Sequence, residues 1–181
     1  MAASSSIVVS TGPARGLVGG VARHMLLLED IARQLPVRLD YFEIGRRPEE
    51  TGAWAQLRRL VADYREFARR LRQARRESSQ VVGHVNSSVR PVCVVRDGGF
   101  VLVARALKVP VIYQVHGCML HGPDDGRPWL RRITRWVLAR ADRVVVLSPA
   151  QSVAIGGRAA MNAVAVNNAV FMEPPPERPE G

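Results

Sequence analysis

Short apolar segments alternate along this chain with longer segments in which apolar residues recur every three or four positions. The short segments are rich in valine and isoleucine, which is typical of strands, and the longer ones have the period of amphipathic helices. Because consecutive parallel strands need helical crossovers, the alternation predicts an α/β fold, a doubly wound, mainly parallel sheet with helices on both faces. The predicted strands are residues 6–10, 37–42, 80–85, 109–115, 143–147 and 162–166, and the predicted helices are 20–34, 53–77, 91–107, 128–140 and a short one from about Pro149.

One domain accounts for nearly all of the chain. The 181 residues are enough to bury a single core. Beyond Phe171 the sequence MEPPPERPEG is rich in proline and glutamate and has almost nothing to bury. We therefore expect one domain over residues 1–171, followed by a linker or disordered tail over 172–181.

The charge is strongly positive, with a net value of +10 and only one lysine, Lys108, among the 26 basic residues. Such a charge favours a polyanionic partner: nucleic acid, an acidic lipid surface or a nucleotide. Aromatic residues are few and do not interleave with the basic cluster, so nucleic acid is the least favoured of the three. The chain shows no export signal and no apolar run long enough to span a membrane, and we expect it to be cytoplasmic.

The most informative position is the end of the strand VPVIYQV, which runs directly into His116 and Gly117. A continuous apolar run of this kind is typical of a strand buried on both faces of a parallel sheet. In open α/β sheets, ligands bind outside the carboxyl ends of the strands. His116 is therefore a candidate site residue.

Other candidates follow the first and third predicted strands. Gly19 and Gly20 open a helix whose unpaired N–H groups suit an anion, and the missing Cβ atoms permit close approach of a ligand. Asn86 and Ser87 follow the third strand, where a role in a cleft and a role in capping the next helix are equally favoured. Arg90, at the start of that helix, is a candidate clamp for an acidic group, against the commoner role of a solvated arginine.

Several residues have simpler interpretations. His84 lies within a strand and is expected to be a hydrogen-bonded core histidine, and His24 is a minor candidate one turn into a helix. Asp124 and Asp125 are expected to be turn residues rather than metal ligands, because no partner lies at ligand spacing. Cys93 and Cys118 lack metal-type spacing and are expected to be structural.

Common enzyme motifs are missing from the sequence. The first glycine-rich loop lacks the G-x-G-x-x-G spacing, and Tyr41, Phe42 and Glu43 at the end of the second strand are a poor substitute for the acidic ribose acceptor, which argues against a dinucleotide site. No Walker lysine and no Ser-His-Asp order are found. Hydrolase and kinase chemistry are therefore not expected.

The predicted helix 53–77 has an apolar stripe and a basic remainder. The stripe is expected to face the core. Its arginines form either a solvated flank or a surface for an anionic membrane, and both interpretations stay open. The basic residues on this flank are Arg58, Arg59, Arg65, Arg69, Arg70, Arg72 and Arg76.

Six sequence segments, taken in order, resemble the amino-terminal half of family-4 glycosyltransferases with the GT-B fold. They are the first strand, GGVARH, HVNSSVRP, VPVIYQVHG, ADRVVVLS and AVNNAV. The resemblance covers nearly the whole chain and implies a Rossmann-like amino-terminal domain that binds the acceptor. In that family a second Rossmann-like domain binds most of the nucleotide-sugar donor, and its characteristic glutamate pair is absent here. The chain is therefore expected to be a fragment without activity on its own.

The resemblance also implies roles for particular residues. Gly19 and Gly20 match the glycine pair near the donor phosphates, and His116 matches the histidine that touches the transferred sugar. Two departures are present: Asn86 stands where many members have a second histidine, and Asn167 and Ala169 stand where proline and glycine are common.

The same resemblance implies transfer of a sugar from a nucleotide-sugar to a glycan or lipid-linked acceptor, with retention of anomeric configuration. No metal and no cofactor are expected, and the departing phosphate helps to deprotonate the acceptor hydroxyl. Apart from the resemblance, the basic flank of helix 53–77 makes an anionic membrane surface, on the inner face of the membrane, a further candidate partner. The alternative from a different class is a stand-alone, non-catalytic Rossmann-like binding module.

Overall fold

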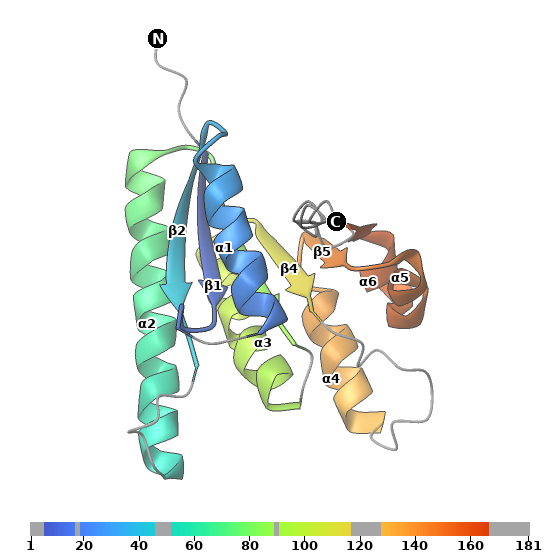
Figure 1. Ribbon diagram of the computed structural model, residues 1–181. Helices are drawn as coiled ribbons and strands as arrows, with labels where there is room; N and C mark the ends of the chain where they lie inside the picture. The colour runs from blue at the N-terminus through green and yellow to red at the C-terminus, as the bar shows by residue number, and fades with distance from the viewer. Residues whose placement is uncertain (1–5, 17–18, 46–51, 89–90, 117–127, 167–181) are drawn as a thin grey trace, which may run out of the picture.

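A computed structural model describes residues 6–16, 19–45, 52–88, 91–116 and 128–166. Within these residues the chain forms one six-stranded, all-parallel sheet in the order β2-β1-β3-β4-β5-β6 (Figure 1). The strands are β1 Ser6–Gly12, β2 Val37–Glu43, β3 Val81–Ser87, β4 Val111–Val115, β5 Arg143–Val146 and β6 Ala163–Ala165, and the helices are α1 Gly20–Ala32, α2 Ala53–Glu77, α3 Pro91–Ala106, α4 Pro128–Leu138, α5 Pro149–Ile155 and α6 Gly157–Met161. This is a Rossmann-like α/β domain, as predicted.

The predicted elements are confirmed, with differences at their ends. β3 runs two residues further than expected, because Asn86 and Ser87 pair with Gln114 and Val115 of β4. They therefore lie inside the strand rather than after it. β4 begins later than expected at Val111, because Pro110 has no N–H to donate to a neighbouring strand.

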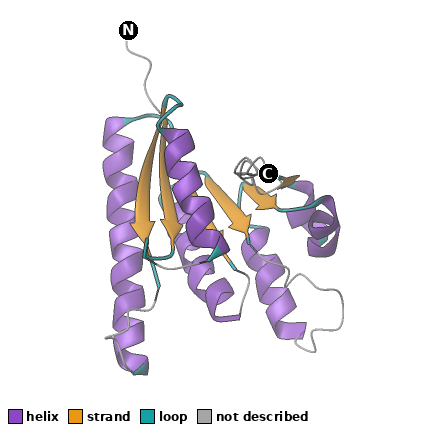
Figure 2. Ribbon diagram, in the orientation of Figure 1, coloured by secondary structure: helices purple, strands orange, loops and turns teal. Residues whose placement is uncertain are grey.

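Helices cover the two faces unequally. On β3, His84 meets Gln114, which also contacts His24 of α1. A Cβ placed on the adjacent Gly83 would lie 3.5 Å from Phe67 of α2. Consecutive strand residues point to opposite faces, so α1 and α2 lie on opposite sides of the sheet. The helices α2, α3 and α4 contact one another in sequence along their side (Figures 1 and 2).

The α2–α4 side holds the main apolar core. Phe42 of β2, Phe67 of α2 and Phe100 of α3 form an aromatic cluster with ring centroids 5.2 to 6.5 Å apart. Phe67 and Phe100 are fully buried. Stacked and edge-to-face aromatic contacts of this kind add about 0.5–1.5 kcal/mol per pair beyond the burial of area, so they fix α2 and α3 to the sheet.

Two consecutive glycines in the middle of α3 let it pack closely against both neighbours. A Cβ on Gly98 would lie 2.7 Å from a methyl carbon of Val137 in α4, and one on Gly99 would lie 2.1 Å from the hydroxyl of Tyr64 in α2. Tyr64 uses that hydroxyl to donate a 2.8 Å hydrogen bond to the carbonyl of Arg96. Glycine is unfavourable inside a helix, so close packing is the reason for both residues.

We expect Gly99→Ala to lower the free energy of unfolding by about 1–3 kcal/mol, because the clash with Tyr64 outweighs the better helix propensity of alanine. Gly20→Ala is the matched control, since a Cβ there meets nothing within 4 Å. Urea unfolding of both variants tests this. A Gly99→Ala protein as stable as the Gly20→Ala protein would contradict the packing role.

Candidate functional site

The candidate site lies where the order of the strands reverses. From β1 the chain passes to β2 on one side, and from β2 it returns across β1 to β3 on the other. The carboxyl ends of β1 and β3 are therefore a topological switch point, where loops diverge and leave a crevice. The polar residues near the ends of β1, β3 and β4 lie at this position.

A buried polar network connects the sheet to α1. The side-chain oxygen of Gln114 in β4 accepts hydrogen bonds from Nε2 of His84, at 3.0 Å, and from Nε2 of His24, at 3.2 Å. His84 Nδ1 lies 2.9 Å from the hydroxyl oxygen of Ser10. Residues of three strands and one helix thus share a continuous set of hydrogen bonds, and His84 is the buried, hydrogen-bonded histidine that was predicted.

Asn86 links this network to His116. Its amide nitrogen donates to the carbonyl of Thr11, at 2.7 Å, and to the Ser10 hydroxyl, at 3.2 Å. A carbonyl oxygen only accepts, so these bonds fix the orientation of the Asn86 amide. Its Oδ1 therefore faces Nε2 of His116 at 2.9 Å.

This orientation determines the tautomer of His116. Oδ1 of Asn86 is an acceptor, so the proton of a neutral His116 ring is on Nε2 and Nδ1 has a lone pair. Nδ1 has no hydrogen-bond partner among the described residues. The ring of His24 contacts His116 edge-on, with centroids 4.8 Å apart.

The three histidines of the site are held neutral. Burial lowers the pKa of His84 to about 4, against the smaller opposing effect of its bond to Gln114. Burial, followed by the proximity of His24 and His84, lowers the pKa of His116 to about 3. Burial also lowers the pKa of His24. These rings therefore act as neutral hydrogen-bonding groups near pH 7.

The glycine pair lies at the beginning of α1. Gly19 is the residue before the helix and Gly20 is its first residue. Gly19 has an extended backbone that any residue adopts, and a Cβ on either glycine would meet nothing within 4 Å. Neither the backbone conformation nor the packing of the described residues requires glycine at these positions.

The other predicted site residues are less accessible or lie outside the described residues. Asn86 is 3% and Ser87 is 1% exposed. Ser87 points to the opposite face from Asn86, where it hydrogen-bonds Asp97 of α3 and Tyr113 of β4. Arg90, Gly117, Cys118, Asp124, Asp125, Asn167, Ala169 and the tail 172–181 lie outside the described residues.

Sequence reasoning missed three members of the network, Ser10, Thr11 and Gln114. For Ser10 and Gln114 the signal was present in the alternation of side chains along β1 and β4: every second residue there faces α1, and these two are polar residues at such positions within otherwise apolar strands. Thr11 follows Ser10 directly, so its side chain faces the α2 side, and it joins the network through its backbone carbonyl. A polar residue on the buried face of a strand needs partners on neighbouring strands, which is the property that identifies this set.

A family model, described as a glycosyl transferase 4-like domain, matches residues 6–166. The chain belongs to this family. The match begins at β1 and ends just after β6, so it spans the whole sheet of this glycosyltransferase-family domain. No match to a curated protein was found.

Two further observations on the glycosyltransferase-family domain concern membrane-spanning helices and metal sites. None of the helices that the structure describes combines the length and apolar character needed to cross a membrane. Within the same residues, no group of three or more histidine, cysteine, aspartate or glutamate side chains is arranged to hold a metal ion.

We expect the free energy of unfolding of this glycosyltransferase-family domain to fall as the pH is lowered from 6.5 towards 4. The unfolded chain binds a proton on His84 near pH 6.5, whereas the folded chain does so only at about pH 4. Stability is therefore complete above pH 6.5 and is lost below it. At about 1.4 kcal/mol per pKa unit, His84 alone contributes a loss of about 2 kcal/mol by pH 5.

Urea unfolding at pH 7, 6 and 5 measures this effect, with His84→Gln as the matched control. Glutamine retains a donor for Gln114 and an acceptor for Ser10 but does not titrate. Asp97, whose carboxyl has a pKa raised by burial, and His116 are common to both proteins and largely cancel in the comparison. Identical pH dependence of the two proteins would contradict the assignment to His84.

Proposed function

We propose that this chain is the acceptor-binding half of a glycosyltransferase that moves a sugar from a nucleotide-sugar to a glycan or lipid-linked acceptor, with retention. The observation that carries the proposal is the His116 tautomer, which leaves a neutral lone pair on Nδ1 at the carboxyl edge of a glycosyltransferase-family domain. A neutral acceptor of this kind suits a sugar hydroxyl, which donates a hydrogen bond and carries no charge. His116 then orients the sugar and does not abstract a proton.

Several site residues act through His116 rather than on substrate. The ring of His116 is itself 5% exposed, so contact with a sugar is limited to its edge. Asn86 is more deeply buried and fixes the ring through Oδ1. We therefore assign Asn86 as a positioning residue. Ser87 contacts Asp97 on the opposite face of the sheet, away from His116. Arg90 and Gly117 remain candidates for contact with substrate.

Gly19 and Gly20 are assigned to the phosphates of the donor. A Cβ on either glycine would meet nothing within 4 Å among the described residues, so packing does not explain the two glycines. In the proposal, the space that they leave is occupied by the donor phosphates. The free N–H groups of the first turn of α1 and the positive end of its dipole favour an anion. No cofactor or metal enters the proposal, and the departing phosphate, as the family resemblance implies, assists deprotonation of the acceptor.

The proposal includes a second, donor-binding Rossmann-like domain. The described strands between residues 6 and 166 form one sheet within a single domain. In the proposal this domain is one wall of a two-domain cleft. We expect residues 1–181 alone to fold without turning over a nucleotide-sugar. Turnover by this chain alone would show that one domain is sufficient.

We expect His116→Ala to lower kcat/KM about tenfold for sugar transfer by the protein that contains both domains. The loss corresponds to about 1.4 kcal/mol, as for one hydrogen bond between neutral groups. His116→Gln should retain more activity, because its amide provides one donor for Asn86 and one acceptor for the sugar. Initial rates over a panel of nucleotide-sugars measure both variants.

Two controls separate this role from folding. Thermal unfolding of both variants must resemble that of the wild type at the assay temperature. Gly20→Val should also reduce transfer while leaving stability unchanged, because its side chain occupies open space. Unchanged kinetics for His116→Ala across the panel would remove His116 from the site and give it a structural role.

We further propose that α2 rests on an anionic membrane, on the cytoplasmic side. Four of its exposed arginines, Arg58, Arg65, Arg72 and Arg76, form no ion pair with any described residue. The first three are spaced by seven residues, which places them along one side of the helix. Arg59, Arg69 and Arg70 are instead paired with carboxylates of Asp63, Glu66 and Asp40.

Exposed apolar side chains lie at the amino-terminal end of α2, close in sequence to Arg58. Trp54 is 72% and Leu57 is 48% exposed. A surface that combines basic residues with exposed tryptophan and leucine is typical of helices that lie in the membrane interface. The unpaired arginines and these apolar residues together support peripheral association.

We expect Arg58→Glu, Arg65→Glu and Arg72→Glu together to reduce co-sedimentation with anionic vesicles by more than tenfold at low salt. Each basic residue near such a surface contributes about 1 kcal/mol before screening. The control is a triple change of Arg23, Arg132 and Arg158 to Glu, which alters the net charge equally on other helices. Equal loss in both variants would show attraction by overall charge alone.

A further inference from the structure

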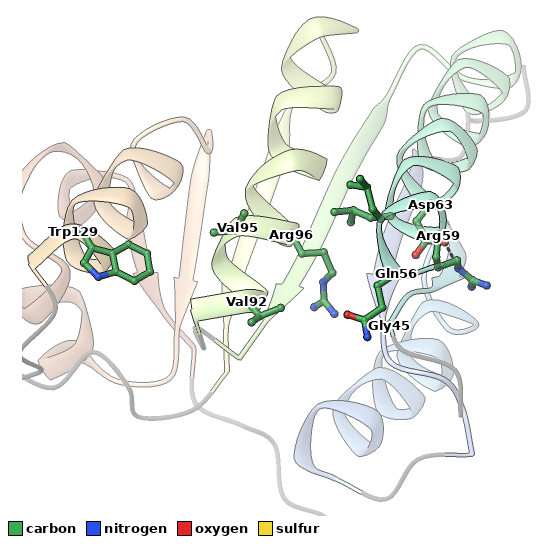
Figure 3. Close-up of a pocket in the computed structure, with 10 residues that line it drawn as sticks. Gly45, Gln56, Arg59, Asp63, Val92, Val95, Arg96 and Trp129 are labelled. Carbon is green, nitrogen blue, oxygen red and sulfur yellow. Dashed lines mark hydrogen bonds and ion pairs between the residues drawn. The ribbon is translucent and has the colours of Figure 1, made fainter. Parts of the chain in front are cut away.

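A pocket of about 630 Å³ lies on the face of the sheet opposite His84 and Gln114. Its residues come from the loop after β2 and from the amino-terminal parts of α2, α3 and α4, so it lies towards the carboxyl edge of the sheet (Figure 3). Its volume is within the range of small-molecule sites, about 300–1,000 Å³. The lining residues are Gly45, Gln56, Leu57, Arg59, Leu60, Asp63, Val92, Val95, Arg96 and Trp129.

The walls of the pocket are mainly apolar, and the apolar side chains are more exposed than a core would leave them. Val92 is 79% exposed, Val95 55% and Trp129 53%. These three residues and Leu57 come from three different helices. An apolar hollow with exposed walls is suited to an apolar ligand, because occupation removes those walls from water.

Arg96 provides a cation at one end of this pocket. Its Nε donates a 2.7 Å hydrogen bond to Oδ1 of Asp97, which is fully buried behind it. This bond uses the Nε edge of the guanidinium. The two terminal nitrogens of Arg96 have no hydrogen-bond partner among the described residues. In Figure 3 the guanidinium points from α3 towards Gln56 of α2.

Both arginines that line the pocket have a carboxylate partner. Arg59 Nε lies 2.8 Å from Oδ1 of Asp63, and Arg96 Nε lies 2.7 Å from Oδ1 of Asp97. Asp97 is fully buried, whereas the Arg96 side chain is 25% exposed and lines the pocket, so its terminal nitrogens are available to a ligand. A planar fork of N–H groups in partly apolar surroundings binds phosphate or carboxylate oxygens strongly.

We propose that this pocket binds a single-chain amphiphilic anion, with the anionic oxygens on Arg96 and the apolar chain between α2, α3 and Trp129. A phosphate and a carboxylate share the chemistry that Arg96 recognises. The inference deepens the proposed function, because a pocket of this kind at the carboxyl edge would receive a lipid-linked acceptor. It predicts binding that does not depend on a donor or on turnover.

Isothermal titration of residues 1–181 with alkyl phosphates below their micelle concentration tests the proposal. Affinity should rise about fourfold for each added methylene while the chain fits the pocket, as expected for about 0.8 kcal/mol per buried CH₂. Inorganic phosphate should bind much more weakly than the alkyl phosphates. An alkyl glucoside, which has the chain without the charge, should also bind more weakly. Equal affinity for either probe would overturn the proposal.

Two pairs of variants locate the binding. Arg96→Gln should weaken alkyl phosphate binding about 10- to 100-fold, as for the loss of a hydrogen bond to a charged group, whereas Arg58→Gln removes the same charge outside the pocket. Val95→Glu keeps the Arg96–Asp97 pair and puts a negative charge in the wall. Its control, Leu102→Glu, changes an exposed apolar residue of the same helix outside the lining set.

Only Arg96→Gln and Val95→Glu should lose binding. If Val95→Glu binds like Leu102→Glu, the pocket is not the site. Competition of alkyl carboxylates with alkyl phosphates shows whether Arg96 prefers a carboxylate or a phosphate. Competition by anionic vesicles shows whether the ligand is a free amphiphile or a lipid headgroup in a membrane. Sugar transfer by the two-domain protein is measured separately. If alkyl phosphates bind but no sugar is transferred, the pocket is supported and the transferase proposal is contradicted. If sugar is transferred but alkyl phosphates do not bind, the transferase proposal is supported and the pocket is contradicted.

Discussion

Burying polar side chains between α1 and the sheet is possible only because they satisfy one another. An unpaired polar group in such a position costs about 1–3 kcal/mol, and a charged histidine costs more. Ser10, His84, Gln114, Asn86 and His116 avoid this cost through hydrogen bonds that cross three strands. The geometry of the site therefore depends on the parallel register of β1, β3 and β4, since a shift of one residue would separate every partner.

The same constraint explains why the histidines of this layer are neutral. Each ring has an amide or hydroxyl oxygen as a partner rather than a carboxylate, and burial penalises the imidazolium. The network therefore has fixed donors and acceptors at neutral pH. The orientation of one amide, that of Asn86, is transmitted to the tautomer of His116.

Much of the fold is predictable from the sequence because its signals are local. The change of hydrophobic period between strands and helices identifies the elements, and the carboxyl end of β4 predicts His116 as a candidate site residue. Other features depend on which surfaces meet. Gly98 and Gly99 have no sequence context that reveals the close approach of Val137 and Tyr64. Ser10 and Gln114 become meaningful only when β1, β3 and β4 lie side by side.

The arginines show the limit of composition most clearly. On α2, arginine appears on every side except the buried stripe, and no pattern in the sequence separates the members paired with carboxylates from those left unpaired. Arg96 is likewise one of many arginines. Its position against a buried aspartate and an apolar pocket follows from the packing of α2 against α3.

At the end of β3, two consecutive residues contact functional candidates on opposite faces of the sheet. Asn86 holds His116 on the α1 side, and Ser87 contacts Asp97, the residue that anchors Arg96, on the other. Side chains in a strand alternate with a period of two, so an insertion or deletion of one residue within β3 would exchange the two faces. A change in strand length would remove both surfaces at once, whereas a substitution affects them separately. The length of this strand is therefore more strongly constrained than the identity of its residues.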